Sequence, residues 1–364
     1  MNEPHNERYF SAFDDTAIWN ESEALFCTSV VPEAPDVATF SFCSPSGAWF
    51  KFKSGQFIEL DLPLPQGTVQ RIYTISSSPS RPLSLSVTVK AQPDSIGGRW
   101  MLDHLRPGTS LKARGPNGLF VLPDDSPRKY LFISAGSGVT PSLAMTTYLF
   151  DIGKAPDICF VHCARRPSDI IARRHVESMA SREPQIKLHY LVEQDDPFSV
   201  WSGYRGRLTQ IMLGIMAPDY VDREVFCCGP EPFMQAVRDM LNALGFEMEN
   251  YHQESFGQPV SELLHDVELN DTVPDVDIES QVVFTRSSVT TQCLQTDTLL
   301  AVAKASGLNI PSGCTMGICG TCKIKKTAGE VHMVHNGGIT ASDIEAGYVL
   351  ACCSNPMGHV EIDV

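Results

Sequence analysis

Four cysteines near the end of the 364-residue chain have the side-chain type and spacing to bind a metal centre. They are Cys314, Cys319, Cys322 and Cys352. Two irons bridged by two sulfides need four thiolates that converge on a small volume. A short loop can supply three of them only where its backbone turns sharply, and the glycines at 317 and 320 permit such turns. The C-x4-C-x2-C spacing with one distant cysteine predicts a [2Fe–2S] cluster.

Three alternatives bear on this interpretation of the cysteine loop. Cys353 competes with Cys352 for the fourth ligand position, although Cys352 fits better and Cys353 is expected to be a buried bystander. A structural zinc site would more usually show two C-x2-C pairs. A disulfide is disfavoured, because twelve cysteines without a secretory signal indicate reduced thiols.

Composition excludes several other functions. The net charge of −15 argues against nucleic-acid binding, because phosphate requires a basic surface. No apolar run reaches the roughly 18–20 residues that a membrane helix needs, so no membrane insertion is expected. The polar, acidic start of the sequence does not resemble a secretory signal, which predicts a cytoplasmic protein.

The elements around the cysteine loop predict a multidomain protein of the α/β plus β class. Residues 1–21 are expected to form a tail, and 22–125 alternate short strands with turns, which is typical of an antiparallel β-barrel. Residues 126–256 alternate strands with helices, which predicts a parallel sheet. The carboxylate-rich segment 257–278 reads as a linker, and 279–364 contain β-rich runs with a helix near 297–307.

The segment Arg71-Ile72-Tyr73-Thr74 ends a predicted barrel strand. It resembles the R-x-Y-[ST] motif of the ferredoxin–NADP reductase-like family, and SSSP, VTVK, LRPG and GPNGLF extend the similarity. The resemblance implies that Arg71 pairs with a flavin phosphate, Tyr73 lies against the flavin and Thr74 approaches flavin N5. A guanidinium fork suits phosphate recognition. The expected flavin-binding set is Arg71, Ile72, Tyr73, Thr74, Val89, Gly97, Gly98, Arg99 and Trp100.

The chain departs from this family in DSIGGRWM, where relatives that bind FAD carry a Ser or Thr for the pyrophosphate. Gly98 stands at that position. Backbone N–H groups of Gly97, Gly98 and Arg99 at a helix start would still suit phosphate. FAD is therefore the expected flavin, and FMN stays open.

Residues of the second segment point to a nicotinamide nucleotide. FISAGSGVTP follows a predicted strand and opens a helix, with Gly136, Gly138, Thr140 and Pro141 in the turn. A glycine turn there lets the backbone approach a pyrophosphate at the helix N-terminus. Two basic residues, Arg165 and Arg166, follow the next predicted strand and could contact the nucleotide. NADH is favoured, and NADPH stays open.

Two further segments resemble parts of the same family. CCGPEP resembles its C-G-P motif, which implies that Cys228 lies beside the nicotinamide ring, with Gly229 and Pro230 following. YHQESF resembles the end of the reductase module, which implies that Glu254 and Phe256 lie near the flavin. The expected catalytic residues are Thr74, Cys228 and Glu254.

Residues 279–364 resemble a plant-type ferredoxin of β-grasp fold, through PSGCTMGICGTCK, GEV and YVLACCSNP. This resemblance assigns the cluster to Cys314, Cys319, Cys322 and Cys352. As a whole, the chain is similar to reductase components of Rieske-type oxygenases, the glycine betaine monooxygenases among them. The family implies electron flow from NADH through flavin and [2Fe–2S] to a terminal oxygenase, which acts on a quaternary amine in one variant.

Other interpretations of the same motifs stay open at this point. The partner could instead be a di-iron monooxygenase or a hybrid-cluster protein. A different class is a redox-sensing electron-transfer module with no dedicated oxygenase.

Overall fold

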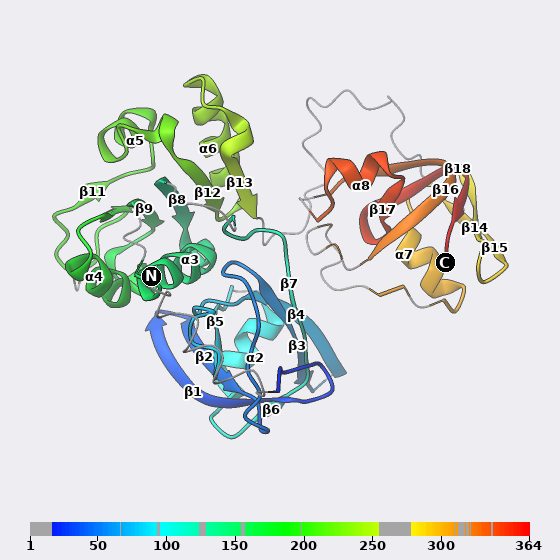
Figure 1. Ribbon diagram of the computed structural model, residues 1–364, viewed down its shortest axis with the longest axis horizontal. Helices are drawn as coiled ribbons and strands as arrows, with labels where there is room; N and C mark the ends of the chain where they lie inside the picture. Colours follow the sequence, from blue (N-terminus) through cyan, green and yellow to red (C-terminus); the bar gives the residue numbers. More distant parts are fainter. Residues whose placement is uncertain are drawn as a thin grey trace, which may run out of the picture. The chain divides into compact units, whose positions relative to one another are not determined.

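The computed structural model describes most of the chain (Figure 1). It covers residues 17–254 and 278–364 apart from 66, 93–94, 124–128, 154–156, 198, 309, 312–316, 318–319, 321 and 336–337. Most of the predicted tail and nearly all of the predicted linker therefore lie outside the described residues, as do Cys314, Cys319 and Phe256. The chain forms two compact units, of which the first holds the barrel and most of the sheet-and-helix domain, and the second holds the C-terminal domain.

The barrel consists of two sheets with the strand orders β5-β2-β1-β6 and β4-β3-β7. A bridge between Ile75 and Val87 joins them. Its elements are β1 (Leu25–Ala34), β2 (Val37–Cys43), β3 (Phe57–Leu64), β4 (Gly67–Thr74), β5 (Leu85–Lys90), α2 (Ile96–His104), β6 (Ser110–Leu111) and β7 (Ala113–Asn117). The β1–β2, β2–β5 and β3–β4 pairs are antiparallel, as predicted.

Alternation of apolar and polar residues explains why these segments form strands. In β2, Phe40 and Phe42 are fully buried, whereas Thr39 and Ser41, which alternate with them, are only half-buried. Successive strand residues face opposite sides of a sheet, so the two phenylalanines point into the barrel and the two hydroxyls point outward. Met101 of α2 joins the same apolar core.

The second domain is built on a six-stranded sheet with the order β11-β10-β9-β8-β12-β13. Its described pairs are parallel from β11 to β12, as predicted from the alternation of strands and helices. The strands are β8 (Lys129–Ala135), β9 (Asp157–Ala164), β10 (Ile186–Val192), β11 (Tyr204–Arg205), β12 (Glu224–Cys228) and β13 (Tyr251–Glu254). The helices are α3 (Val139–Asp151), α4 (Arg173–Arg182), α5 (Gln210–Met216) and α6 (Glu231–Ala243).

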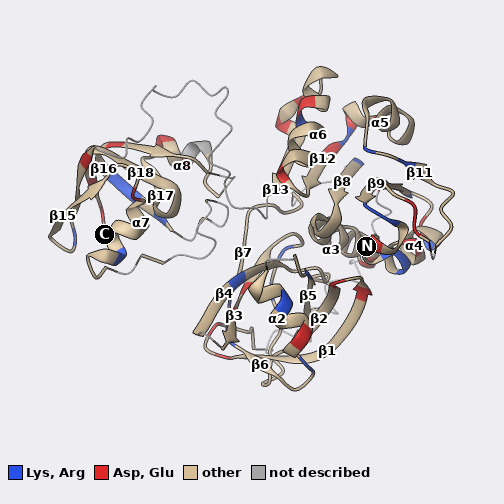
Figure 2. Cartoon of the chain, turned by 180° about the vertical axis from the view of Figure 1, so that it is seen from behind, with Lys and Arg blue, Asp and Glu red and all other residues tan. Residues whose placement is uncertain are grey.

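Helices α3 and α4 cover one face of this sheet and α5 covers the other (Figures 1 and 2). The Cys159 thiol of β9 donates to the Met216 carbonyl of α5 at 3.4 Å. Even-numbered residues of β9 therefore face α3 and α4, because side chains alternate along a strand. Helix α5 was not predicted from the sequence, and it begins at a Thr209 hydroxyl that accepts from the Met212 N–H.

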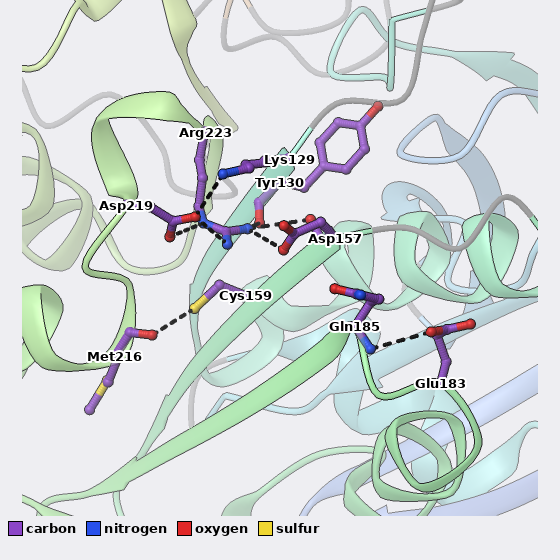
Figure 3. Close-up of polar contacts among 9 residues, drawn as sticks. All are labelled: Lys129, Tyr130, Asp157, Cys159, Glu183, Gln185, Met216, Asp219 and Arg223. Carbon is purple, nitrogen blue, oxygen red and sulfur yellow. Dashed lines mark hydrogen bonds and ion pairs between the residues drawn. The ribbon is translucent and has the colours of Figure 1, made fainter.

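An ion-pair network closes the amino end of the sheet (Figure 3). The Arg223 guanidinium is 1 % exposed and donates to both carboxylate oxygens of Asp219, at 2.7 and 2.9 Å. It also pairs with Asp157 Oδ1 at 2.9 Å and donates to the Tyr130 carbonyl at 3.1 Å. Hydrogen bonds from Arg223 lower the pKa of the Asp219 carboxyl to about 2. This network lies at the edge opposite to the glycine turn after β8.

The C-terminal domain is a mixed five-stranded sheet with the order β15-β14-β18-β16-β17. Strands β14 and β18 are parallel, and the other described pairs are antiparallel. Its elements are β14 (Glu279–Phe284), β15 (Val289–Leu294), α7 (Leu299–Ala305), β16 (Lys323–Met333), α8 (Ala341–Glu345), β17 (Tyr348–Leu350) and β18 (Ser354–Ile362). Strand β16, which starts with three lysines in four residues, carries a run of blue in Figure 2. The predicted fold class is confirmed.

Candidate functional site

The predicted flavin motif occupies the end of β4, beside β3. Arg71 is paired with Leu60, and Thr74 with Phe57, in the antiparallel register. The Thr74 side chain is buried, whereas Arg71 is exposed. Burial raises the pKa of the Tyr73 phenol, and the nearby Arg71 charge opposes this effect. Tyr73 therefore stays neutral and offers an aromatic face.

The start of α2 lies against Arg71, which brings two parts of the predicted flavin site together. A Cβ on Gly97 would be 3.0 Å from Arg71 Cγ and 3.3 Å from Arg71 Nε. The guanidinium side chain therefore packs on the helix start, where backbone N–H groups and the helix dipole favour an anion. Arginine and a glycine cradle at a helix N-terminus are a donor set that fits a flavin phosphate.

A hydroxyl at this helix start belongs to Ser95, which caps the helix and accepts from one of the N–H groups expected to bind phosphate. Ser95 is the N-cap of α2, and its Oγ accepts from the Gly98 N–H at 3.1 Å. A Cβ on Gly98 would lie 2.8 Å from that oxygen. Ser95 was not among the predicted residues, although a serine directly before an Ile-Gly-Gly helix start is a capping signal.

Other predicted flavin residues face elsewhere. The Arg99 guanidinium donates to Asp103 at 2.9 and 2.7 Å and to Asp36 at 2.8 Å. Val89 is 1 % exposed within the barrel core, and Trp100 packs partly against that core. The Arg99 N–H donates to the Ser95 carbonyl at 3.0 Å, so both the backbone N–H and the guanidinium of Arg99 are engaged within the protein.

The predicted nucleotide loop folds as a tight turn between β8 and α3. Gly136 has a φ of +56°, in the left-handed region that favours glycine, and begins a single 3-10 turn (Gly136–Gly138). The Thr140 hydroxyl donates to the Ser137 carbonyl at 3.1 Å. Pro141 lies in the first turn of α3 and is buried. The turn leaves backbone at the carboxyl end of the parallel sheet, where nucleotides bind in open α/β folds.

A lysine from the barrel reaches this loop. Lys90 ends β5, and its Nζ would lie 3.9 Å from a Cβ on Gly136. Burial and the charge of Arg165 lower the pKa of Lys90, while Asp169 and Asp36 oppose them. Lys90 therefore lies beside the glycine turn and within electrostatic range of Arg165, and two such cations suit a pyrophosphate. Lys90 was missed, although it ends the VTVK segment.

The other basic residue predicted here points away from this pair. Arg166 Nε donates to Gln194 Oε1 at 3.4 Å, beyond the end of β10. Both Arg165 and Arg166 are exposed and follow β9 directly. Of these two arginines, Arg165 is the one whose charge acts on Lys90.

A row of polar side chains crosses the sheet next to Cys228. The parallel register aligns Cys228 with Ser134, Ser134 with His162, and His162 with Tyr190. Ser134 Oγ and His162 Nδ1 are 2.9 Å apart. Burial lowers the pKa of His162 to about 4, with a smaller contribution from Lys90, so the imidazole is neutral near pH 7. His162 was not predicted, because its partner is apparent only from strand register.

The remaining predicted residues of this domain lie at strand ends. Cys228 is 1 % exposed at the end of β12, and Gly229 and Pro230 follow it into α6. Glu254 is 4 % exposed at the end of β13. Phe256 lies outside the described residues.

The described part of the cysteine loop holds two sulfurs that accept backbone hydrogen bonds. The Cys352 N–H donates to Cys322 Sγ at 3.4 Å, and the Gly317 N–H donates to Cys352 Sγ at 3.3 Å. Both cysteines are buried. N–H groups aimed at sulfur stabilise thiolate charge, so this pair fits a cluster site. Cys314 and Cys319 lie outside the described residues.

Two glycines and Cys353 complete the surroundings of these sulfurs. A Cβ on Gly317 would lie 2.8 Å from Cys353 Sγ, and one on Gly320 would lie 2.7 Å from the Gly338 carbonyl oxygen. Both glycines have φ near +70°. Cys353 is only half-buried, whereas the sequence predicted a buried side chain. The Cys353 side chain packs against the domain core without being enclosed by it.

The fold and these sites define a class of protein, namely a reductase with flavin, nicotinamide and iron–sulfur domains. Three family models match the chain: an oxidoreductase FAD-binding domain at 28–122, an oxidoreductase NAD-binding domain at 132–239, and a 2Fe-2S iron-sulfur cluster binding domain at 283–357. Among the described residues, no helix is long and apolar enough to cross a membrane.

Relatives match over nearly the full chain. The stachydrine N-demethylase reductase subunit of Rhizobium meliloti (strain 1021) is 56% identical over 352 residues, covering 96% of this chain and 99% of that protein. The glycine betaine monooxygenase reductase subunit of Chromohalobacter salexigens is 44% identical over 357 residues, covering 96% and 97%. The chain therefore belongs to the family of oxygenase reductase subunits, and it is an oxidoreductase that uses FAD, NADH and a [2Fe–2S] cluster.

Solved structures share the fold at lower identity. Phthalate dioxygenase reductase is 21% identical with a TM-score of 0.60, covering 95% of this chain and 100% of that one. An intact type IV self-sufficient cytochrome P450 monooxygenase is 22% identical with a TM-score of 0.72, covering 94% of this chain and 41% of that one. These likenesses support the three-domain architecture.

Proposed function

We propose that this protein supplies electrons to a Rieske-type oxygenase that acts on a quaternary amine. The observation that carries the proposal is the match over 96% of the chain to two reductase subunits, whose names assign them to stachydrine demethylation and glycine betaine oxygenation. We propose that the protein works in the cytoplasm. We also propose that its domains have the limits expected from the sequence, with the barrel at 22–125, the sheet domain at 126–256 and the cluster domain at 279–364.

The flavin end of the pathway is proposed to lie at β4 and the start of α2. Arg71 and the N–H groups around Gly97 bind the flavin phosphate, because both offer donors at one place. Tyr73 offers its ring, and the Thr74 hydroxyl is proposed to face the flavin ring. When bound, FAD accepts a hydride from NADH, and the iron–sulfur cluster carries single electrons onward.

The nucleotide end is proposed to lie at the Gly136–Pro141 turn. Lys90 and Arg165 neutralise the pyrophosphate, and the turn allows close backbone approach. The Cys228 thiol and the Glu254 carboxyl are proposed to border the nicotinamide and the flavin, with Thr140 at the start of α3. Exclusion of water by the buried Cys228 would favour direct hydride transfer.

At the exit, Cys322 and Cys352 are proposed to bind the cluster together with Cys314 and Cys319. The N–H groups of Cys352 and Gly317 stabilise negative charge on the sulfurs of Cys322 and Cys352, respectively. Hydrogen bonds to cluster sulfurs raise reduction potential, which favours electron transfer from a reduced flavin.

Reconstitution with candidate oxygenases tests the function. The purified protein is mixed with a Rieske-type demethylase for stachydrine or glycine betaine, and substrate-dependent NADH consumption and demethylated product are measured. Coupled product formation is expected. Coupling only to a di-iron monooxygenase or a hybrid-cluster protein would refute the Rieske proposal. Rapid cytochrome c reduction that supports no oxygenase would favour a redox-sensing role.

Replacing Lys90 tests the nucleotide site separately. Lys90→Gln removes one of the two cations near Gly136, so KM for NADH should rise about tenfold while flavin content is unchanged. Lys187→Gln is the matched control, because Lys187 is an exposed lysine on β10. An unchanged KM in Lys90→Gln would contradict the assignment.

A further inference from the structure

A polar contact joins the barrel to the sheet domain away from the chain crossing. Arg81 Nε donates to Asp151 Oδ2 at 2.9 Å, and Arg81 Nη2 donates to Asp151 Oδ1 at 2.7 Å. The Ser80 hydroxyl donates to the same Asp151 Oδ2. The Asp151 side chain is 15% exposed and that of Arg81 is 57% exposed. A two-bond fork between guanidinium and carboxylate fixes direction as well as distance.

The barrel side of this contact is a rigid turn near the flavin motif. Ser78 Oγ and Ser80 Oγ are 2.6 Å apart, and the Arg81 N–H donates to the Ser78 carbonyl at 3.1 Å. Ser78 is 1 % exposed and comes four residues after Thr74. The turn therefore presents Ser80 and Arg81 from backbone that continues directly from β4.

The sheet side is the last residue of α3, whose first residues follow the nucleotide loop. Helix α3 runs from Val139 to Asp151, which corresponds to about 20 Å at 1.5 Å per residue. Thr147 of α3 contacts His175 of α4, with 3.1 Å between Oγ1 and Nε2. Helix α3 lies on the barrel side of the sheet (Figures 1 and 2). A displacement at Asp151 would therefore be transmitted along a packed helix to Gly138.

The charges around Asp151 support an ionic contact. Hydrogen bonds from Arg81 and Ser80 outweigh burial and lower the pKa of the Asp151 carboxyl. His175 lies in the same electrostatic neighbourhood, with Arg81, Glu33 and Asp151, and burial lowers its pKa. The imidazole is therefore neutral near pH 7, and Arg81 is the cation that balances Asp151.

We propose that Arg81, Ser80 and Asp151 are positioning residues that hold the nucleotide loop at the correct distance from the flavin strand for hydride transfer. The proposal rests on the proposed placement of flavin at β4 and of nicotinamide at the Gly136–Pro141 turn. In the part of the chain that the structure describes, the barrel is followed by the sheet domain between β7 and β8, and a single covalent connection leaves rotation free. The fork restricts that rotation at a second place, in addition to the approach of Lys90 to the Gly136 turn. Because hydride transfer needs reacting atoms about 3–3.5 Å apart, a displacement of about 1 Å costs about 100-fold in rate.

The test uses the holoenzyme with Arg81→Gln and, separately, Asp151→Asn. Flavin reduction by excess NADH is followed anaerobically in a stopped-flow instrument, with NADH and with NADH deuterated at both C4 positions. Each variant should reduce its flavin at least tenfold more slowly and show a changed isotope effect, while NAD+ affinity stays within about twofold of wild type. A slower flavin reduction with unchanged NAD+ affinity distinguishes a positioning role from a role in nucleotide binding.

Arg286→Gln is the matched control. Arg286 forms the same kind of fork with Asp363, at 2.6 Å for both bonds, within the C-terminal domain. Its rate should stay within twofold of wild type. Hydrogen exchange of the apoproteins gives a readout without cofactors, and the backbone at 148–152 should exchange faster in Arg81→Gln than in wild type.

A charge-swapped double variant, Arg81→Asp with Asp151→Arg, guards against a purely structural explanation. It should recover most of the rate, because the fork is rebuilt in reverse and arginine suits a helix C-terminus. Two results would overturn the proposal: single variants that keep the wild-type rate, or a swapped variant that refolds and binds FAD without recovering the rate. If wild type itself does not reduce its flavin with NADH, the proposed function fails instead.

Discussion

Replacing Gly317 by alanine measures how closely the cysteine loop is folded around its sulfurs. Gly317 has a φ of +69°, and a Cβ there would lie 2.8 Å from Cys353 Sγ and 3.0 Å from His335 Cα. Its N–H donates to Cys352 Sγ at 3.3 Å. Any movement that relieves the contacts therefore also disturbs a hydrogen bond to a proposed cluster ligand.

Two energetic costs add in Gly317→Ala. A non-glycine residue in the left-handed region costs about 1–2 kcal/mol. The new methyl group also approaches two neighbours more closely than an ordinary contact, and overpacking of this kind costs about 1–3 kcal/mol. His335 contributes backbone on this side and cannot rotate away as the Cys353 side chain can. The expected destabilisation is about 2–5 kcal/mol.

Gly307→Ala in the same domain carries only the backbone cost, so the difference between the two variants measures the cost of overpacking. Gly307 has a φ of +77° with no atom within 4 Å of its hypothetical Cβ, so its expected loss is about 1–2 kcal/mol. Loss of the visible cluster absorbance during urea unfolding of the full chain reports on this domain. Gly317→Ala should bleach at clearly lower urea than Gly307→Ala. Equal midpoints would refute the close packing inferred around the sulfurs.

Three further perturbations address single features of the structure. Cys352→Ser should abolish the [2Fe–2S] absorbance and Cys353→Ser should retain it, because of these two sulfurs it is Cys352 Sγ that accepts from the Gly317 N–H. The opposite outcome would make Cys353 the cluster ligand. The folded-state pKa of His162 is about 4 against an ordinary 6.5, so the unfolded chain binds more protons between these values. Its stabilising contribution is complete above about pH 6.5 and is lost as pH falls toward 4, with a slope of at most about 1.4 kcal/mol per pH unit. His162→Leu should flatten urea midpoints over that range, and an unchanged slope would contradict the burial argument. Arg223→Met should cost about 3 kcal/mol in urea unfolding, because it leaves two carboxylates without their buried partner (Figure 3). The pair of Arg173 with the exposed Glu177 should cost only about 0.5 kcal/mol when Glu177→Gln removes it and leaves Arg173 over the Trp201 ring, and equal losses would contradict the role of burial.

Much of the fold was predictable because local patterns agree with tertiary structure. Strand β2 alternates phenylalanine with Thr39 and Ser41, and α3 begins directly after a glycine turn. Helix α5 escaped prediction because its apolar pattern does not match its environment. Ile211 and Ile215 are 75% and 62% exposed, so the helix presents apolar residues to solvent rather than forming a regular amphipathic pattern.

The site was predictable where one motif contributes all its members, and not where separate elements meet. The pairing of Ser134 with His162 depends on the register of β8 with β9. The approach of Lys90 to Gly136 depends on contact between two domains. Neither relation has a local signal, because residues from distant segments become neighbours only through tertiary structure.

The nucleotide site proposed at Lys90 would explain how an acidic chain can bind an anionic nucleotide. The chain carries a net charge of −15, so its overall field repels phosphate at long range. At the glycine turn, burial and the charge of Arg165 lower the pKa of Lys90, so the charged form of Lys90 is costly in the free protein. In the proposed site, the negative charge of a bound pyrophosphate would offset both effects on Lys90. Asp36 and Asp169 limit the cost of charging Lys90 in the free protein, because their charges raise its pKa.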